Sequence, residues 1–342
     1  MKLLKKKILY KDWIYEWLLD KKNYIKESTY ANYSNNIFNH IIPKLGDYYL
    51  KDINHRIIQN FLLELSKSGN KNTENGLSEK TIKDISIIVK GSIKKAINEE
   101  LMNHIELTFN YPKSNNEDKI YILTKKEQNK ITNYCINNLN NRNIGILLSL
   151  YSGIRIGELC ALKWSDIDFK KGILTINKTI QRIYIKDKEV NTTKIIITNP
   201  KTKNANREIP INKDFLCILK NNKTKPQDYI LSGNNKYIEP RTYRKYFEKV
   251  LKINNLKHIN FHSLRHTFAT NCISLGVDYK TVSELLGHAN VNITLNLYVH
   301  PRMSQKKKCI DLVSKVFQEK VNWIFFFFIW LIHRKTWYNY II

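Results

Sequence analysis

Four side chains that can act on a phosphodiester lie in one short stretch near the C-terminal end of the sequence. The segment 261–300 contains His262, Arg265, His288 and Tyr298. Imidazoles can transfer protons, a guanidinium can hold two phosphate oxygens, and a phenol can act as an oxygen nucleophile. The set predicts chemistry on a phosphodiester. A surface helix with chance His and Arg residues, or a buried core tyrosine, would also fit these residue types.

Two cations earlier in the chain extend the candidate site. Arg155 follows Gly153 at an expected helix start, where unpaired backbone N–H groups favour anions, and Glu158 can hold it one turn later. Lys201 lies between two expected strands, where a hairpin turn would project it into a groove, and Lys203 competes with it. Beside a polyanion a lysine can act as a general acid. Taken singly, an ordinary salt bridge and a solvated loop lysine remain alternatives.

The charge of the chain indicates a polyanionic partner. The sequence has 57 basic and 30 acidic residues, a formal net charge of +27. Nucleic acid is the simplest such partner. The abundance of Lys, Asn and Ile also allows compositional drift as the origin. A length of 342 residues with 42% hydrophobic and 25% charged residues fits two globular domains.

Cysteines and carboxylates give no sign of a metal centre or a cofactor. The five cysteines form no CxxC pair, so neither a zinc site nor a disulfide framework is indicated, and a reducing compartment fits. No carboxylate cluster suited to two metal ions accompanies the candidate residues. The basic N-terminus has no apolar core, so we expect no signal peptide and a cytoplasmic, nucleoid-associated protein.

The aromatic segment at the end of the chain, 319–342, is of unclear origin. Its apolar part, VNWIFFFFIWLI at 321–332, is shorter than the about 20 residues that cross a membrane. It is therefore too short to cross a membrane unaided, and no membrane partner is expected. The segment could lie on another subunit or on the surface of a bilayer, or it could be a non-native extension.

The first part of the chain, 8–105, has the pattern of a helical domain. We expect a helix over 8–19, a second that starts at Ser28 or Thr29 and stops near residue 42 because Pro43 follows, a third capped by Asn54, and a long one from Ser78. Their apolar stripes predict a four-helix core. Residues 106–119, with Pro, Asn and charge but no period, read as a linker.

The second part, 120–318, has a mixed pattern. It begins with a capping box at Thr124 and Glu127, and Gly153 can end a later helix in the left-handed conformation. Strands are expected at 167–169, 173–176, 195–198 and 207–211, with helices after about residue 213. The segment 282–300 reads at first as a helix-turn-helix, although its second helix is poor in base-reading side chains.

Four motifs, in order, carry a resemblance to a known family: SGIRIGELCALKWSDIDF, NPKTKNANREIPI, FHSLRHTFAT and LLGHANVNITLNLYVH. The chain resembles the tyrosine recombinase (phage integrase) family, in the style of integrases of phages and conjugative transposons. The resemblance implies a mainly α fold with a small antiparallel β-sheet. It implies a SAM-like core-binding domain at 8–105 and a tyrosine recombinase catalytic domain at 120–318. No separate arm-type DNA-binding domain is expected before residue 8, and the 319–342 tail is foreign to the family pattern.

The resemblance also implies a mechanism. Tyr298 would attack the scissile phosphate, giving a 3′-phosphotyrosyl enzyme and a free 5′-hydroxyl. Arg155 and Arg265 would clamp the non-bridging oxygens, and Lys201 would protonate the departing 5′-oxygen. The 5′-hydroxyl of the partner strand would attack next, so the reaction needs neither metal nor ATP.

The remaining roles follow in the same way. His262 would assist proton transfer on the tyrosine side, and His288 would hydrogen-bond the phosphate. The partners implied are double-stranded DNA at core or attachment sites, a homo-tetramer on two duplexes and an accessory directionality factor, for integration or excision of a phage or mobile element. A type IB topoisomerase is the alternative enzyme, and a catalytically idle DNA-binding regulator is the alternative from another class.

Overall fold

A computed structural model of the chain describes residues 7–70, 75–112, 121–199 and 206–298, with 303, 307 and 309–315. The chain forms two compact units. The first contains Met1–Tyr121, Thr179–Thr198 and Ile238–Arg244, and the second contains the remainder. Two segments from the expected 120–318 domain thus group with the first unit, and the domain boundaries stay a prediction.

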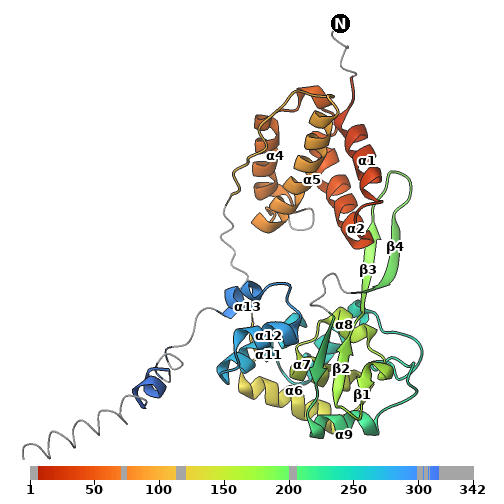
Figure 1. Ribbon diagram of the computed structural model, residues 1–342. Coiled ribbons are helices and arrows are strands. Elements are labelled where there is room, and N and C mark those ends of the chain that lie inside the picture. The colour runs from red at the N-terminus through yellow and green to blue at the C-terminus, as the bar shows by residue number, and fades with distance from the viewer. Residues whose placement is uncertain are drawn as a thin grey trace, which may run out of the picture. The chain divides into compact units, whose positions relative to one another are not determined.

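Helices build most of the first unit (Figure 1). They are α1 (Tyr10–Lys21), α2 (Glu27–Asn36), α3 (Ile42–Leu45), α4 (His55–Ser68) and α5 (Glu79–Asn98). Two expected caps are confirmed: the Asn54 side chain accepts from the backbone N–H of Ile57 at 3.0 Å, and the Ser78 hydroxyl accepts from that of Thr81 at 3.3 Å. Such caps satisfy N–H groups that have no partner within the helix.

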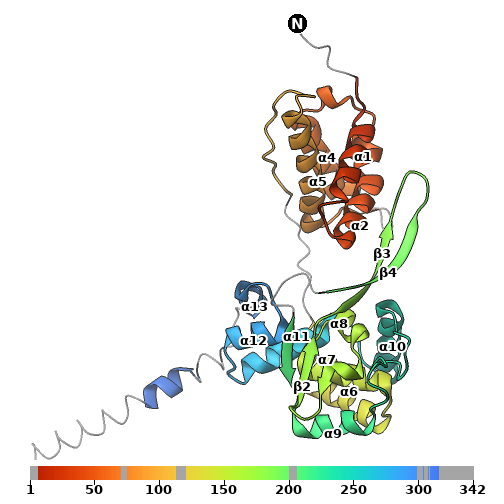
Figure 2. The same ribbon diagram turned by 45° about the vertical axis from the view of Figure 1, so that its right-hand side comes forward.

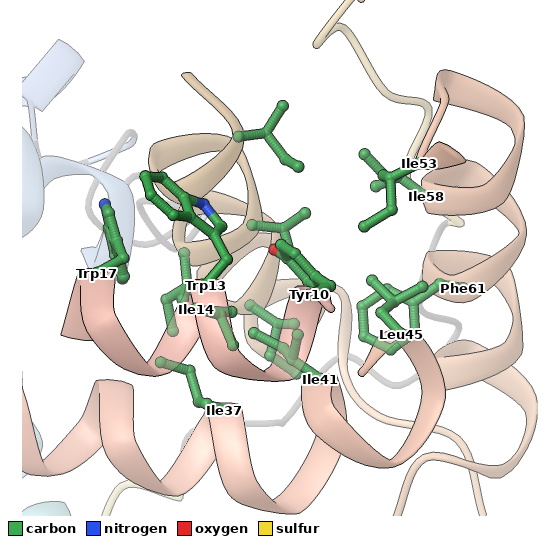
Figure 3. Close-up of a cluster of buried hydrophobic side chains, with 14 of the residues drawn as sticks. Tyr10, Trp13, Ile14, Trp17, Ile37, Ile41, Leu45, Ile53, Ile58 and Phe61 are labelled. Carbon is green, nitrogen blue, oxygen red and sulfur yellow. The ribbon is translucent and has the colours of Figure 1, made fainter. Parts of the chain in front are cut away.

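The predicted apolar stripes meet in one core, part of which is shown in Figure 3. Ile14 of α1 and Ile58 of α4 are fully buried there. Two polar side chains inside the core are paired with Ser92: the Tyr10 hydroxyl lies 2.7 Å from the Ser92 hydroxyl, and the Trp13 indole donates to the Ser92 carbonyl at 3.0 Å. The core continues past α5, because Phe109, within the expected linker, is also buried.

The expectation that the second helix stops before Pro43 is wrong. A π-helical turn, η1 (Ile37–Ile41), follows α2 directly, and α3 continues with Pro43 in its first turn. A proline lacks the backbone N–H that a helix interior needs, but first-turn N–H groups have no intrahelical partner. The change of hydrogen-bond register in η1 therefore lets the helical chain pass the proline.

A β-hairpin in the first unit was missed in part by the sequence pattern. Strand β3 (Thr179–Ile185) was not expected, and it pairs antiparallel with β4 (Thr192–Thr198). The hairpin lies beside α2 in both Figure 1 and Figure 2. Asn35 of α2 donates to the carbonyl of Tyr184 at 2.5 Å, and the Tyr15 hydroxyl donates to Asp187 at 2.9 Å.

The second unit combines helices with a small sheet. Its helices are α6 (Lys125–Asn137), α7 (Asn141–Ser152), α8 (Ile156–Ala161), α9 (Lys213–Asn221), α11 (His262–Ser274), α12 (Tyr279–Leu286) and α13 (Val291–Tyr298), and α10 (Pro240–Ile253) continues into it from the first unit. The predicted capping box is confirmed. The backbone N–H of Thr124 donates to Glu127 at 2.7 Å, and that of Glu127 donates to the Thr124 hydroxyl at 3.3 Å.

The sheet of the second unit has the antiparallel order β1–β2–β5. Its strands are β1 (Ile167–Asp168), β2 (Ile173–Ile176) and β5 (Arg207–Pro210). Because β4 pairs with β3 and β5 pairs with β2, the segment between β4 and β5 joins two different sheets. The hairpin turn expected around Lys201 is therefore wrong. Residues 200–205, Lys201 and Lys203 included, lie outside the described part of the chain.

No helix within the described ranges is long and apolar enough to cross a membrane. The aromatic segment 319–342 lies outside these ranges, so both readings of its origin stay untested.

Candidate active site

Arg155 stands between two helices at a sharp change of chain direction. Helix α7 ends at Gly153, which adopts the predicted left-handed conformation with φ of 64°, and α8 begins immediately after Arg155. The guanidinium donates to Glu158 at 2.7 Å, as expected, and to the carbonyl of Gly287 at 3.2 Å. The Arg155 backbone N–H also donates to Glu158, at 2.9 Å. That N–H is thus committed to a carboxylate of the chain itself, so it is not one of the unpaired groups expected at this helix start.

Arg265 is held deep within the second unit. Only 3% of it is exposed, and its guanidinium donates to the carbonyls of Gly153 at 2.8 Å and Leu286 at 2.7 Å. These carbonyls lie at the C-terminal ends of α7 and α12, where the helix dipole is negative and carbonyl groups lack intrahelical partners. Arg265 therefore joins α11 to the ends of α7 and α12.

His262 begins α11, one turn before Arg265. Its ring meets that of His266 edge to face, with centroids 4.7 Å apart, so His266 is a direct neighbour of His262. His262 keeps an exposed edge. Partial burial of the ring, followed by repulsion from His266, Arg265 and Arg155, lowers the pKa of His262 to about 4. At neutral pH His262 is therefore uncharged, and a neutral imidazole has one ring nitrogen that can accept a hydrogen bond.

His288 follows Gly287 at the end of α12. It is 8% exposed, and its Nδ1 lies 2.7 Å from the hydroxyl of Thr294 in α13. Burial and then the charges of Arg265, Arg155 and other groups lower the pKa of His288 to about 3. His288 is thus neutral at pH 7 and ties α13 to the end of α12.

The two remaining predicted residues are less fully described. Tyr298 is the last residue of α13, and its side chain lies outside the described part of the structure. Lys201 lies outside it as well. The structure therefore brings Arg155, His262, Arg265 and His288 into one cluster, with α13 leading from it to Tyr298.

Arg207 is a fifth member of this cluster that the sequence reasoning missed. Its guanidinium donates to both Glu158 oxygens, at 3.2 and 2.9 Å, and to the carbonyl of Leu285 at 2.7 Å. The alternation of β5 carried a signal. Arg207 shares the inward face of the strand with Ile209, and a charge on an inward face requires a partner.

The cluster as a whole suits an anion. The Arg155 and Arg207 guanidinium groups pair with one buried carboxylate, Glu158, and Arg265 adds a third positive charge, while both histidines are neutral at pH 7. Burial alone would raise the pKa of Glu158, but Arg207 and then Arg155 hold it below its usual value, so Glu158 stays ionised. The excess positive charge can stabilise a phosphodiester and the further charge that develops as it reacts.

Comparison with known proteins decides the family. Residues 119–305 match the model described as the phage integrase family, and residues 9–66 match the phage integrase N-terminal SAM-like domain. The chain belongs to the phage integrase family. Like the tyrosine recombinases of this family, it is an enzyme that cleaves and rejoins DNA strands.

Curated members of the phage integrase family extend this likeness. A "Tyrosine recombinase XerC-like" protein of Caldanaerobacter subterraneus subsp. tengcongensis is 29% identical over 90% of this chain and 83% of its own length. The "ICEBs1 integrase" of Bacillus subtilis is 27% identical over 80% of this chain and 75% of its own. The "Transposase from transposon Tn916" of Enterococcus faecalis is 28% identical over 67% of this chain and 60% of its own.

Solved structures share the fold. The Tn1549 transposon integrase, solved with a circular intermediate DNA, matches with a TM-score of 0.69 at 20% identity, covering 90% of this chain and 99% of that one. A lambda integrase dimer bound to a core site matches with a TM-score of 0.60 at 20% identity, covering 86% of this chain and 78% of that one. The predicted fold class, mainly helical with small antiparallel sheets, is confirmed, with two sheets where one was expected.

Proposed function

We propose that this phage integrase family member is a site-specific recombinase whose Tyr298 attacks a scissile phosphate. The attack gives a 3′-phosphotyrosyl linkage and a free 5′-hydroxyl. One observation carries the proposal: two arginines and two neutral histidines gather at the end of α12, and His288 anchors the helix that ends at Tyr298. A phenol with a pKa of about 10 needs such neighbours to attack at neutral pH.

Each residue of the set has a distinct proposed task. Arg155 and Arg265 bind the non-bridging oxygens, because each offers guanidinium N–H groups near the same helix end. His262, uncharged at pH 7, assists proton transfer on the Tyr298 side, and His288 hydrogen-bonds the phosphate. Lys201 protonates the departing 5′-oxygen, a task that its position in the matched motif supports.

The second half of the reaction restores the DNA backbone. The 5′-hydroxyl of a partner strand attacks the phosphotyrosine and releases the Tyr298 hydroxyl, so bond energy is retained and no ATP is consumed. A homo-tetramer on two duplexes would supply the partner strand. A lambda integrase tetramer bound to a Holliday junction, which shares the fold with a TM-score of 0.57 at 22% identity, supports this assembly.

The biological task is integration or excision of a phage or mobile element, with an accessory directionality factor. Relatives named for transposon Tn916 and for ICEBs1 support it. The 8–105 domain would grip double-stranded DNA at the core site while the 120–318 domain carries the chemistry. A net charge of +27 supports broad contact with phosphates and a place on the nucleoid in the cytoplasm.

The test is covalent capture on a nicked core-site duplex. Cleavage beside the nick releases the short fragment that bears the free 5′-hydroxyl, so the strand cannot be rejoined and the covalent intermediate accumulates. Wild-type protein should become joined to a 3′ end, and Tyr298→Phe should not. Tyr279→Phe, at the first residue of α12, is the matched control and should link normally. Linkage by Tyr298→Phe would show that the nucleophile is another residue. DNA binding without linkage in the wild type would favour the idle regulator.

A second substrate separates the recombinase from a type IB topoisomerase. Supercoiled plasmid without an attachment site should keep its supercoils, whereas two plasmids that each carry a site should recombine. Relaxation of the plasmid without a site and of the plasmids with a site, in the absence of recombinant product, would favour the topoisomerase.

A further inference from the structure

The C-terminal end of α12 holds three arginines in a row. The successive carbonyls of Leu285, Leu286 and Gly287 accept from Arg207, Arg265 and Arg155 in that order, at 2.7, 2.7 and 3.2 Å. Carbonyl groups at a helix C-terminus lack intrahelical partners and carry the negative end of the helix dipole. The end of α12 therefore binds cations. Its three successive carbonyls fix the positions of the three guanidinium groups relative to one another.

Arg207 differs from the other two because it has no proposed contact with DNA. Its side chain is only 5% exposed, whereas 36% of the Arg155 side chain is exposed. All three guanidinium nitrogens of Arg207 donate to acceptors of the chain itself, the Leu285 carbonyl and the two Glu158 oxygens, so each is already committed. Any effect of Arg207 on the reaction must therefore pass through a neighbour.

Glu158 is that neighbour. Its two oxygens accept from Arg207, and one of them also accepts from Arg155 at 2.7 Å. The Glu158 side chain is 5% exposed, so water cannot replace a lost partner. Arg155 and Arg207 thus share one buried carboxylate and bind adjacent carbonyls of α12. With both arginines in place, neither Glu158 nor Arg155 can turn without breaking hydrogen bonds.

We propose that Arg207 is a positioning residue for strand cleavage, holding the Glu158 carboxylate so that Glu158 directs the exposed side of Arg155 toward the scissile phosphate. The inference rests on the proposed function and assigns Arg207 a task within it. Loss of the two hydrogen bonds from Arg207 to Glu158 would leave Arg155 charged and able to bind DNA. Its guanidinium would, however, be misaligned with the reacting phosphate. A misplacement of about 1 Å at a reacting centre can cost about 100-fold in rate.

Arg207→Lys is the informative variant. Lysine keeps the positive charge but can bond only one carboxylate oxygen at a time and has no planar fork to reach Leu285 as well. At saturating protein, single-turnover cleavage of the nicked duplex should fall by about 10- to 100-fold. The DNA dissociation constant should stay within about 3-fold of wild type, since the guanidinium nitrogens of Arg207 donate to acceptors of the chain itself.

Arg182→Lys is the matched control. Arg182 also forms a fork with a carboxylate, Glu239, at 3.0 and 2.6 Å, but it lies in the β3–β4 hairpin of the first unit. It should cleave like the wild type. This control removes the general effect of exchanging a paired arginine for lysine.

A methylphosphonate at the scissile position separates positioning from simple loss of stability. This group lacks one charged non-bridging oxygen, so cleavage depends less on where Arg155 points. The defect of Arg207→Lys relative to wild type should shrink to less than about 3-fold on this substrate. A residue needed only for stability would show the same defect on both substrates, matched by a loss of folded protein in a thermal unfolding scan.

Three outcomes would overturn the role of Arg207. The first is cleavage by Arg207→Lys at the wild-type rate. The second is a cleavage defect of the same size on the phosphodiester and methylphosphonate substrates. The third is a cleavage defect that equals the loss of folded protein. Absence of any covalent product with wild-type protein would instead refute the proposed function, and the role of Arg207 with it.

Discussion

Replacement of Gly153 by alanine should disturb the site through one added methyl group. Gly153 ends α7 with φ of 64°, a conformation that costs an L-residue roughly 1–2 kcal/mol. A Cβ built there would lie 2.6 Å from Cδ1 of Phe268 and 2.7 Å from Cδ2 of Leu286. Both distances are well below van der Waals contact, so the two side chains must move.

The magnitude follows from these two costs. Overpacking of this kind costs about 1–3 kcal/mol, so Gly153→Ala should lower the free energy of unfolding by about 2–5 kcal/mol. Gly276→Ala separates the two costs. Gly276 also has a positive φ, of 89°, but a Cβ there meets nothing within 4 Å. The restriction of the unfolded chain by alanine is the same in both variants, so their difference measures the steric clash.

Urea unfolding of both variants gives the comparison, and cleavage of the nicked duplex gives a second measurement. The Gly153 carbonyl accepts from Arg265, so a shift of this turn should also slow cleavage per folded molecule. Gly276→Ala should cleave at the wild-type rate. An equal loss in the free energy of unfolding in the two variants would show that the Phe268 and Leu286 side chains move aside at no cost. The steric reasoning would then be refuted.

Three further predictions concern single contacts. Arg265→Ala should lose at least about 100-fold in cleavage with DNA binding largely kept; equal loss of both would assign Arg265 to binding. Because the pKa of His288 is about 3 in the folded chain and 6.5 unfolded, only the unfolded chain gains this proton between those values. His288 should therefore contribute a fall of about 2 kcal/mol to the free energy of unfolding from about pH 7.5 to pH 5. Urea titrations at both pH values check this, and a slope unchanged in His288→Asn would contradict it. Thr124→Ala, which breaks the capping box, should cost about 1 kcal/mol in the same titration, and an unchanged midpoint would contradict this value.

The sequence predicted those features correctly whose structure depends on residues within about one helical turn of each other. The caps at Asn54 and Thr124 and the left-handed end at Gly153 each depend on a few neighbouring residues. The contact of Arg155 with Glu158 was predictable for the same reason, since residues three apart on a helical turn face one another.

Features that depend on distant partners were not predictable in this way. The position of Arg207 in the site depends on its hydrogen bonds to Glu158, 49 residues earlier, and to the carbonyl of Leu285, 78 residues later. Strand β3 has no strict alternation, and its stability comes from β4 and from contacts such as that of Asn35 with Tyr184. The path past Pro43 depends on a π-helical turn, which no residue in the segment signals.

The row of carbonyls at the end of α12 also has a consequence for the order of folding. Its hydrogen bonds to Arg155, Arg207 and Arg265 span sequence separations of 132, 78 and 21 residues. Contacts between distant residues must close long loops and so form late. A nascent or partly unfolded chain can therefore form the helices of the first unit before its three arginines meet the end of α12. If the proposed function holds, strand cleavage then becomes possible only after α12 has docked on all three arginines.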